Sequence, residues 1–423
     1  MHRGYNMVEF LNRYIGLQIE NGYGSAGTTT TYGEVDSESL QHKFELLTRN
    51  DMSHHMATKS VVGTSYSEGG MDLAIQCDNF FGKLLYGCWP HQLTPTGTGP
   101  YTHVMLEPTL VGHTYPSFKI TVGREEKQHT YTGMAIDTLS LSANVGEYTM
   151  ASASFVGKAE SATGALISTE SITFSGDALD ALHFADGTVT FNDGTAVDSE
   201  VATGKVKSFS LDISMNRDTD NAYAIGNSTY TSIPAAQRRE ITGTIEFNQV
   251  VYTAATGTDE PTYDLLIGAN GEEYSSTTSL PALSLKFTDE AGADYFEIEL
   301  YHLRFEAPEA NVSGRDTNTM SLNFVALGQQ GNTRTFTATT GGNTTLTVDA
   351  ANWDKVKIGD ILNSAGISAG TYVIAKPSGT TLTISANAST TASETITIMP
   401  NYTSSAVTLK GDNLNSAIYA HDA

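Results

Sequence analysis

The stretch of sequence that decides the fold is Val206-Lys207-Ser208-Phe209-Ser210-Leu211-Asp212-Ile213-Ser214-Met215. Its apolar residues recur at every second position from Phe209 to Met215, and Ser or Asp occupies the positions between them. This period of two is typical of an antiparallel strand with one buried and one solvated face. The same alternation occurs in residues 241–248 and again in residues 294–305. The pattern therefore predicts an all-β protein with one or two short helices.

The composition excludes several classes of protein. The 423 residues include 23 basic and 47 acidic side chains, which gives a formal net charge of −24, and two cysteines. Two cysteines cannot make a disulfide scaffold. No apolar run approaches the roughly 18 residues of a membrane span, and residues 1–11 hold no apolar export segment. No basic tract exceeds the pair Arg238-Arg239, so we expect little attraction to phosphate backbones.

Two predicted helices indicate an internal duplication. Asp78 is placed to cap the first helix, and Pro261 is placed to open the second. Each helix follows a predicted strand and precedes a strand pair with a similar closing sequence, Ser154-Phe155-Val156 or Asn323-Phe324-Val325. We therefore predict a duplicated antiparallel β-sandwich or barrel over residues 1–331, with pseudo-repeats at about 35–158 and 200–328.

Residues 332–400 differ in composition from the rest of the chain. They are rich in Thr, and short alternating stretches separated by turn residues predict a small separate β module. The last residues, 401–423, contain another strand-like stretch. We expect this C-terminal segment to return to the main body and the module to lie on the outer surface.

A long segment without clear periodicity follows the first predicted strands. We expect residues 44–70 to form a functional loop, because long structureless loops are uncommon in compact domains. Its apolar side chains suggest that it contacts another surface. The candidate contact residues of this loop are Phe44, Leu46, Leu47, Met52, His54, His55 and Met56.

The sequence carries no convincing catalytic or cofactor site. Gly22-x-Gly24-x-x-Gly27 matches a dinucleotide fingerprint by letter, but the threonines that follow are poor helix formers. Asp218-x-Asp220 lacks the glycine of a calcium loop, and no histidine or cysteine spacing completes a zinc site. We therefore predict no enzyme activity, no metal and no cofactor.

A series of short sequences in order resembles the tail tube proteins of tailed bacteriophages, over roughly residues 10–330. These sequences are Arg13-Tyr14-Ile15-Gly16-Leu17-Gln18-Ile19-Glu20, Tyr23-Gly24-Ser25-Ala26, Tyr32-Gly33-Glu34-Val35, Gly70-Met71-Asp72-Leu73-Ala74-Ile75, Phe81-Gly82-Lys83-Leu84-Leu85-Tyr86-Gly87, Tyr101-Thr102-His103-Val104, Pro116-Ser117-Phe118-Lys119-Ile120 and Tyr131-Thr132-Gly133-Met134-Ala135-Ile136-Asp137-Thr138-Leu139-Ser140-Leu141-Ser142-Ala143. Residues 332–400 depart from this pattern and resemble small β modules of phage structural proteins.

The resemblance implies a structural virion protein whose hexameric rings stack into a tail tube, assembled in the host cytoplasm. The implied partners are copies of the chain itself, the tape measure, terminator and distal tail proteins, and genomic DNA as passive cargo during ejection, with no membrane. It also implies a long loop that bridges subunits or rings. Polar alternate positions supply the lumen-lining candidates, which are Asp212, Glu246, Glu297 and Glu299.

Two alternative functions remain open from the sequence. One is another virion β protein, such as a head decoration or baseplate component. The other is a carbohydrate-binding or glycosidase-like β protein, because Glu297 and Glu299 share one strand face about 7 Å apart. Exposed alternate acids are also routine on solvated sheet faces, so this spacing alone does not define an active site.

Overall fold

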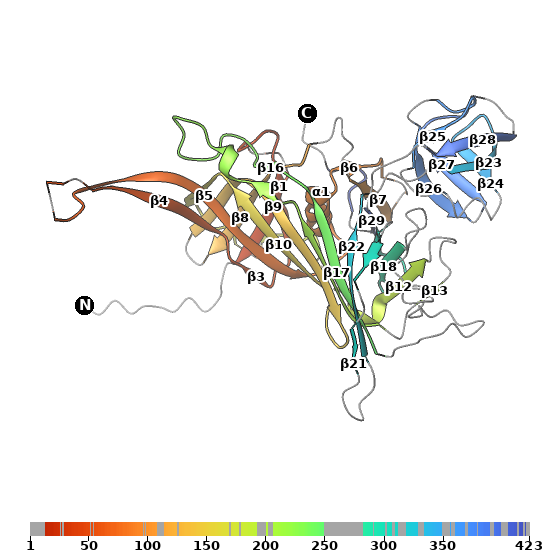
Figure 1. Cartoon of the computed structure of the whole chain (residues 1–423), viewed down its shortest axis with the longest axis horizontal. Helices are drawn as coiled ribbons and strands as arrows, with labels where there is room; N and C mark the ends of the chain where they lie inside the picture. Colours follow the sequence, from red (N-terminus) through yellow and green to blue (C-terminus); the bar gives the residue numbers. More distant parts are fainter. Residues whose placement is uncertain are drawn as a thin grey trace.

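A computed structural model shows a chain built almost entirely of antiparallel strands, with one α-helix among the residues it describes (Figure 1). The all-β prediction is therefore confirmed. The structure describes residues 13–419 except 26, 28, 51, 54, 96, 98, 108–113, 125–126, 169–170, 177–178, 193–199, 202–205, 249–281, 291, 301–302, 307–308, 312–318, 329–333, 349–355, 357–359, 369–370, 379, 390–392, 399–404, 413 and 418.

The largest sheet has 14 strands, and one continuous part of it forms what we call the wall sheet. In spatial order the wall sheet contains β4 (Gln41–Arg49), β5 (Lys59–Ala74), β10 (Met150–Gly157), β9 (Lys127–Asn144), β14 (Val206–Ser214), β17 (Glu240–Phe247) and β22 (Thr319–Ala326), with β3 (Ser37–Glu38) beside β5 and both β20 (Leu303–Phe305) and β21 (Glu309–Asn311) beside β22. The alternation at residues 206–215 and 241–248 thus marks two central strands of this sheet.

The long strand β9 joins the wall sheet to a second group of strands. Its first half pairs with β8 (Phe118–Arg124) and β11 (Ala159–Gly164), and its second half pairs with β10 and β14. The group is completed by β1 (Tyr14–Ile19), which pairs with β8, and β2 (Thr31–Gly33), which pairs with β1.

A seven-stranded second sheet covers the apolar face of the wall sheet. Its spatial order is β13 (Glu200–Val201), β12 (Gly187–Asn192), β18 (Ala282–Thr288), β19 (Tyr295–Leu300), β29 (Ser405–Gly411), β7 (Tyr101–Leu106) and β6 (His91–Gln92). The C-terminal strand β29 therefore lies between a strand from early in the chain and a strand from much later. It closes the sheet by joining segments from opposite ends of the sequence, as the β29–β7 pair Ala406↔Leu106 shows.

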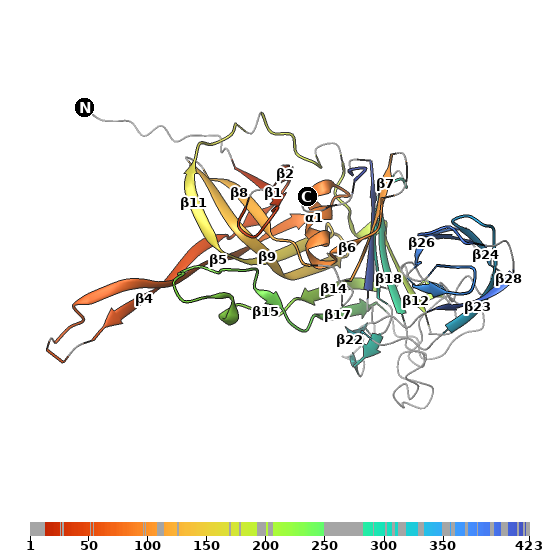
Figure 2. The ribbon, with the colours of Figure 1, turned by 90° about the horizontal axis from the view of Figure 1, so that it is seen from above.

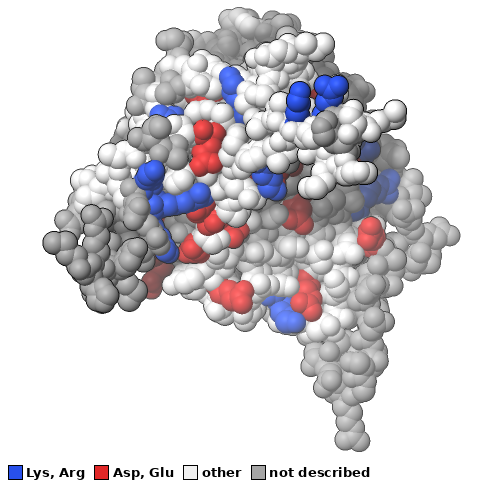
Figure 3. Space-filling model, turned by 90° about the vertical axis from the view of Figure 1, so that its left-hand side faces the viewer, with Lys and Arg blue, Asp and Glu red and all other residues white. Residues whose placement is uncertain are grey.

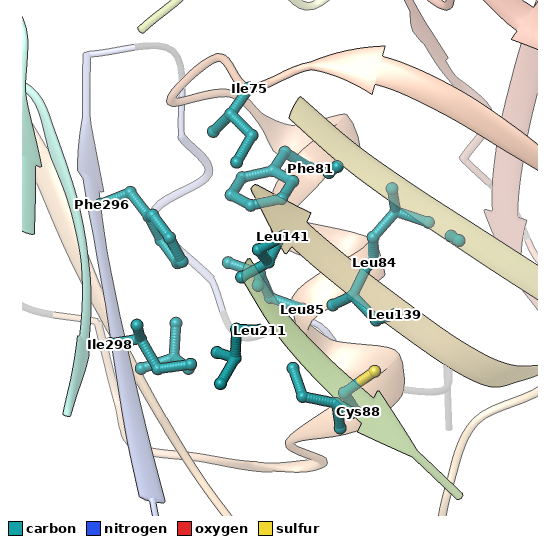
Figure 4. Close-up of a cluster of buried hydrophobic side chains, with 14 of the residues drawn as sticks. Ile75, Phe81, Leu84, Leu85, Cys88, Leu139, Leu141, Leu211, Phe296 and Ile298 are labelled. Carbon is teal, nitrogen blue, oxygen red and sulfur yellow. The ribbon is translucent and has the colours of Figure 1, made fainter. Parts of the chain in front are cut away.

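The core lies between the two sheets and the helix. The Phe209 ring of the wall sheet is 5.6 Å from the Phe287 ring of the second sheet, centroid to centroid. Phe81 of the helix meets Phe296 edge to face at 5.2 Å. Figure 4 shows Leu211, Phe81 and Phe296 directed toward one another from three elements. Alternation on both sheets therefore buries the apolar side chains in one shared core and turns the polar side chains outward.

The first predicted helix is confirmed as α1 (Asn79–Cys88). The Phe81 backbone N–H donates to Asp78 Oδ1 at 2.8 Å, so Asp78 is the N-cap. All but one of its residues are buried, which explains why α1 is apolar nearly all round. The second predicted helix, opened by Pro261, lies outside the described residues.

Residues 334–398 form a separate six-stranded sheet with its own hydrophobic cluster. Its spatial order is β25 (Leu362–Asn363), β28 (Ser393–Ile398), β23 (Arg334–Thr340), β24 (Thr345–Val348), β27 (Thr381–Ile384) and β26 (Val373–Ser378). Tyr372 packs on a small cluster formed by Leu93, Val104, Leu106 and Ala406 at the edge of the second sheet. The module therefore contacts the main body through at least this side chain.

The wall sheet contains the same strand arrangement twice. The first set is β4-β5-β10-β9, and the second is β14-β17-β22 followed by β20 and β21. A remaining small element, β15 (Arg217–Asp218) with β16 (Ala235–Ala236), belongs to the connection between β14 and β17. Two 3-10 turns, η2 (Phe184–Asp186) and η3 (Asp220–Ala222), complete the described elements.

Candidate functional site: the polar wall and the projecting arm

The outward face of the wall sheet carries short polar side chains that are joined across neighbouring strands. Ser152 Oγ donates a hydrogen bond to Asp72 Oδ1 at 2.6 Å. Ser140 Oγ donates to a carboxylate oxygen of Asp212. Each pair lies in register on adjacent strands. These bonds hold the carboxylates in place and leave a surface of hydroxyl and carboxylate groups, which we call the polar wall.

The polar wall is poor in cationic side chains. β10, β17 and β22 contain no Lys or Arg, and neither does the part of β9 that pairs with β10, residues 135–144. In β14 the single cation is Lys207, whose Nζ is 3.2 Å from Glu246 Oε1. This exposed pair adds little stability, but it balances the only positive charge of β14. The other cations of the wall sheet lie in its outer strands, at Lys43, Arg49, Lys59 and Arg304. The central part of the wall, formed by β10, β9, β14, β17 and β22, is therefore neutral to acidic.

Two of the four lumen-lining candidates lie together on the polar wall. Asp212 is an exposed residue of β14, and Glu246 is a half-buried residue of the neighbouring strand β17. Glu246 accepts hydrogen bonds from Lys207 Nζ and from Ser208 Oγ, both at 3.2 Å. As the alternation in the sequence predicts, both residues lie on the outward side of their strands.

The other two candidates lie on the opposite side of the sandwich. Glu297 and Glu299 alternate with Phe296 and Ile298 on β19 of the second sheet. Because Phe296 and Ile298 share the core with the apolar residues of the wall sheet, the two glutamates point away from the polar wall. The four acids therefore do not line one surface. Alternation identifies a solvated face but does not tell which sheet it belongs to.

The outer face of the second sheet has a different chemical character. Lys286 Nζ lies 4.1 Å from the Tyr295 ring centroid and 3.9 Å from Glu297 Oε2. Ser284 Oγ donates to Glu297 Oε1 at 2.9 Å. Burial raises the pKa of Tyr295 to about 12, so the phenol stays neutral. On this face a cation thus lies over an aromatic ring and beside an acid.

The segment predicted as a structureless loop is a β-ribbon instead. β4 and the first half of β5 pair from Gln41↔Glu68 to Arg49↔Lys59, and they project from the body as an arm, residues 41–66 (Figures 1 and 2). The loop prediction was wrong because the turn residues lie in the middle of the segment, where they connect two strands. The arm and the six-stranded module lie at opposite ends of the molecule's longest axis.

The outer part of the arm carries exposed apolar side chains on both faces. Leu46 lies opposite Val62, and on the other face of the ribbon Leu47 lies opposite Val61; all four side chains are exposed. The other described arm candidates are exposed as well, namely Phe44, Met52, His55 and Met56. His54 lies outside the described residues. Apolar side chains on both faces fit a ribbon that inserts between two surfaces.

The base of the arm is held by a connection from the second half of the chain. This supporting loop, residues 215–239, joins β14 to β17. The Tyr66 ring stacks on Tyr230 at 6.2 Å, and Tyr223 lies 4.7 Å from Tyr230. The Ser65 backbone N–H donates to the Ser228 carbonyl at 2.7 Å. The supporting loop thus anchors the arm at its root.

Figure 3 views the molecule from the side toward which the arm projects. On this face Lys and Arg groups and Asp and Glu groups are interspersed, several of them side by side, with uncharged areas around them. The described part of this face is therefore not a concentrated field of one sign, despite the net charge of −24.

The described residues offer little for nucleophilic or metal chemistry. Cys77 and Cys88 are buried free thiols, and burial raises the pKa of Cys88 to about 12 and that of Cys77 well above its usual range. Within the part of the chain that the structure describes, no group of three or more His, Cys, Asp or Glu is arranged to hold a metal ion. Nor does any described helix have the length and apolarity needed to cross a bilayer.

The fold and these surfaces define an all-β structural protein with a doubled wall sheet and a projecting apolar arm. A family model described as phage tail tube protein matches residues 11–326 of the chain, and the chain belongs to this family. A search of curated proteins found no match. The protein is therefore a structural component of the phage tail, and its family, which is not known as enzymatic, implies self-assembly and contacts with other tail proteins. The match ends before β23, the first strand of the six-stranded module.

Proposed function

We propose that the chain forms rings that stack into a tail tube, and that the polar wall lines the channel through which the DNA genome passes during ejection. The observation that carries the proposal is the lack of Lys and Arg in β10, β17 and β22. Fixed carboxylates and hydroxyls repel phosphate or contact it weakly, so DNA slides without being held. Asp212 and Glu246 are then lumen residues, and Glu297 and Glu299 are not.

The doubled strand order bears on the number of chains in each ring. The family resemblance implies hexameric rings, and each chain contributes eight wall positions in two sets of four. A strand spacing of ~4.8 Å and a tilt of ~40° make a channel about 48 Å across between backbones for three chains, and about 96 Å for six. A single DNA duplex with its hydration fits the narrower channel. We therefore propose six repeats in each ring, supplied by three chains.

The arm and the module take distinct roles in this tube. The arm, through Phe44, Leu46, Leu47, Met52 and Met56, bridges neighbouring subunits or rings, and His54 and His55 lie near its tip in the sequence. We divide the chain into a tube domain (1–331, repeats at about 35–158 and 200–328), an outer module (332–400) and a returning C-terminal segment (401–423).

The proposed life cycle follows from the tube. The rings assemble in the host cytoplasm around the tape measure protein, and the finished tube contacts the terminator and distal tail proteins at its two ends. Genomic DNA is passive cargo in the lumen. No cofactor is required, because the work of assembly is done by burying apolar and strand-edge surface.

Electron microscopy of the purified protein and the mass of its rings test this proposal. We expect hollow tubes of stacked rings with three chains in each ring. Rings of six chains would overturn the stoichiometry, and discrete solid particles or a persistent monomer would overturn the tube itself. Head decoration or baseplate proteins would give such discrete particles.

Cysteine labelling tests which face lines the lumen. Asp212→Cys and Glu299→Cys each add one accessible thiol, because the native cysteines are buried. A bulky maleimide polymer should label both variants rapidly as unassembled chains. In tubes, labelling of Asp212→Cys should slow at least tenfold while labelling of Glu299→Cys is unchanged. The reverse pattern would place the second sheet in the lumen.

A further inference from the structure

The contact between the two repeats within one chain is itself a strand pair. β9, the last strand of the first set, pairs with β14, the first strand of the second set. The ladder runs from Asn144↔Ser208 to Thr138↔Ser214 and includes Ser140 opposite Asp212. The wall sheet therefore passes from one repeat to the next without interruption.

The two repeats share their register, as a Phe–Gly pair shows. Phe155 of β10 lies opposite Gly69 of β5, and Phe324 of β22 lies opposite Gly243 of β17, so Phe155 and Phe324 are equivalent positions of the two repeats. In the β10–β9 ladder the register shifts by one residue after Ser154. The registers of the β22–β21 and β22–β20 ladders differ by the same one residue, and this shift falls at the equivalent place along β22. Together β20 and β21 therefore correspond to the second half of β9.

Each of the two strand sets also has a hydrogen bond from a serine to the acid opposite it on the neighbouring strand. Ser37 Oγ of β3 donates to Asp72 Oδ2 at 2.6 Å, and Ser208 Oγ of β14 donates to Glu246 Oε2 at 3.2 Å. Each serine is the register partner of its acid. Ser37 and Ser208 are therefore equivalent positions as well, and β3 with the beginning of β4 corresponds to β14.

The two outer edges of the wall sheet lack a second neighbour among the described strands. β3 and β4 pair with β5 alone, and β20 and β21 pair with β22 alone. At Leu40, between β3 and β4, the backbone N–H is taken by Glu38 Oε2 at 3.0 Å and the carbonyl accepts from Tyr131 Oη at 3.0 Å. The edge is therefore closed at Leu40, and its open part begins at Gln41.

We propose that the β20–β21 edge of one chain pairs with the β4 edge of the next chain in the register that β9 and β14 use within the chain. Ser140 and Glu309 are separated by the same number of residues as Phe155 and Phe324, so they are equivalent positions of the two repeats. Gln41 and Asp212 are separated by the same number of residues as Ser37 and Ser208, so they are equivalent positions as well. Gln41 of one chain therefore lies opposite Glu309 of its neighbour. This inference deepens the proposed ring and rests on it, because it names the strand pair that joins the subunits.

Both strand edges favour unwanted association when they are unpaired. Unpaired strand edges recruit other strands, and a head-to-tail contact that closes into a ring removes all of them at once. The junction within the chain shows that strands of these two repeats already pair in the required order. A heterologous contact of this kind makes the subunit boundary nearly equivalent to the repeat boundary, so the channel wall is continuous.

Paired cysteines test the register. The variant Gln41→Cys/Glu309→Cys should form an intermolecular disulfide in assembled tubes, because directly opposed positions have Cα atoms about 4.5–5.5 Å apart and disulfides span about 4.4–6.8 Å. The control is Gln41→Cys/Ala310→Cys, in which the two side chains leave opposite faces of the sheet. Non-reducing gels of oxidised tubes should show chains linked into dimers and trimers for the first variant, at least tenfold more than for the control.

The outcomes separate this inference from the proposed function. Tubes that form normally but give no cross-link for the Gln41/Glu309 variant, or equal cross-linking for the control, overturn the proposed junction and leave the tube intact. A wild-type chain that forms no rings in electron micrographs overturns the tube first. If the double variant itself does not assemble, the single variants Gln41→Cys and Glu309→Cys are mixed in equal amounts. Each chain then has one engineered cysteine, so the expected product is a linked dimer without trimers, and its absence in assembled tubes overturns the junction.

Discussion

Replacing two leucines of the arm by serine should weaken tube assembly without destabilising the subunit. Leu46 and Leu47 are 59% and 58% exposed in the single chain, on opposite faces of the arm. Fully burying a leucine stabilises by about 2 kcal/mol, so burying the exposed part of each on docking contributes about 1.2 kcal/mol. The double variant Leu46→Ser/Leu47→Ser therefore loses about 2.4 kcal/mol of assembly free energy.

This loss corresponds to a rise of about 50-fold in the concentration at which tubes appear, and each single variant should give about sevenfold. The assay is pelleting of tubes over a range of protein concentrations. The matched control is Ser60→Ala, an exposed polar position of the same arm. The thermal midpoint of the unassembled double variant should equal that of the wild type, because neither leucine packs in the core.

Two results would refute this reasoning. Assembly of the double variant at the wild-type concentration would show that the arm stays solvated in the tube. A lowered thermal midpoint of the unassembled chain would show that the leucines stabilise the subunit itself. Equal effects of the two single variants would further indicate that both faces of the arm are covered in the tube.

Three further outcomes follow from the subunit. Gly243→Ala should lower the free energy of unfolding by about 1–3 kcal/mol in denaturant titrations. The reason is that a Cβ there would lie 2.3 Å from the Phe324 ring and 2.7 Å from a backbone oxygen. The control Thr244→Ala should lower the free energy of unfolding by less than about 1 kcal/mol. Burial raises the pKa of the Asp78 carboxyl to about 6, above its unfolded value of ~3.9, so its stabilising contribution is present below pH ~4 and is lost as the pH rises through 6. Relative to Asp78→Asn, the wild type should lose up to about 3 kcal/mol of unfolding free energy across that window; a flat difference contradicts the assignment. Tyr372→Ala should speed limited proteolysis around the six-stranded module while tubes still pellet at the wild-type concentration, since the ring packs on the main body and not on the polar wall.

Local patterns in the sequence predicted much of the subunit. The alternation at residues 206–215 and 241–248 fixed two strands and their buried faces, because the side-chain period of a strand needs no tertiary information. The cap at Asp78 located α1 for the same reason. The arm was missed as a ribbon because its pairing partner lies beyond the turn, and a strand exposed on both faces shows no alternation.

The sequence by itself determined that the chain is all-β, that it is acidic, and that Asp212, Glu246, Glu297 and Glu299 each occupy a solvated strand face. Only the tertiary structure decided that the first two lie on the polar wall and the last two on the opposite side. It also decided that β29 closes the second sheet and that β9 joins β14. The physical reason is that periodicity reports how a strand divides inside from outside, whereas the direction of that outside depends on pairing between residues far apart in the chain.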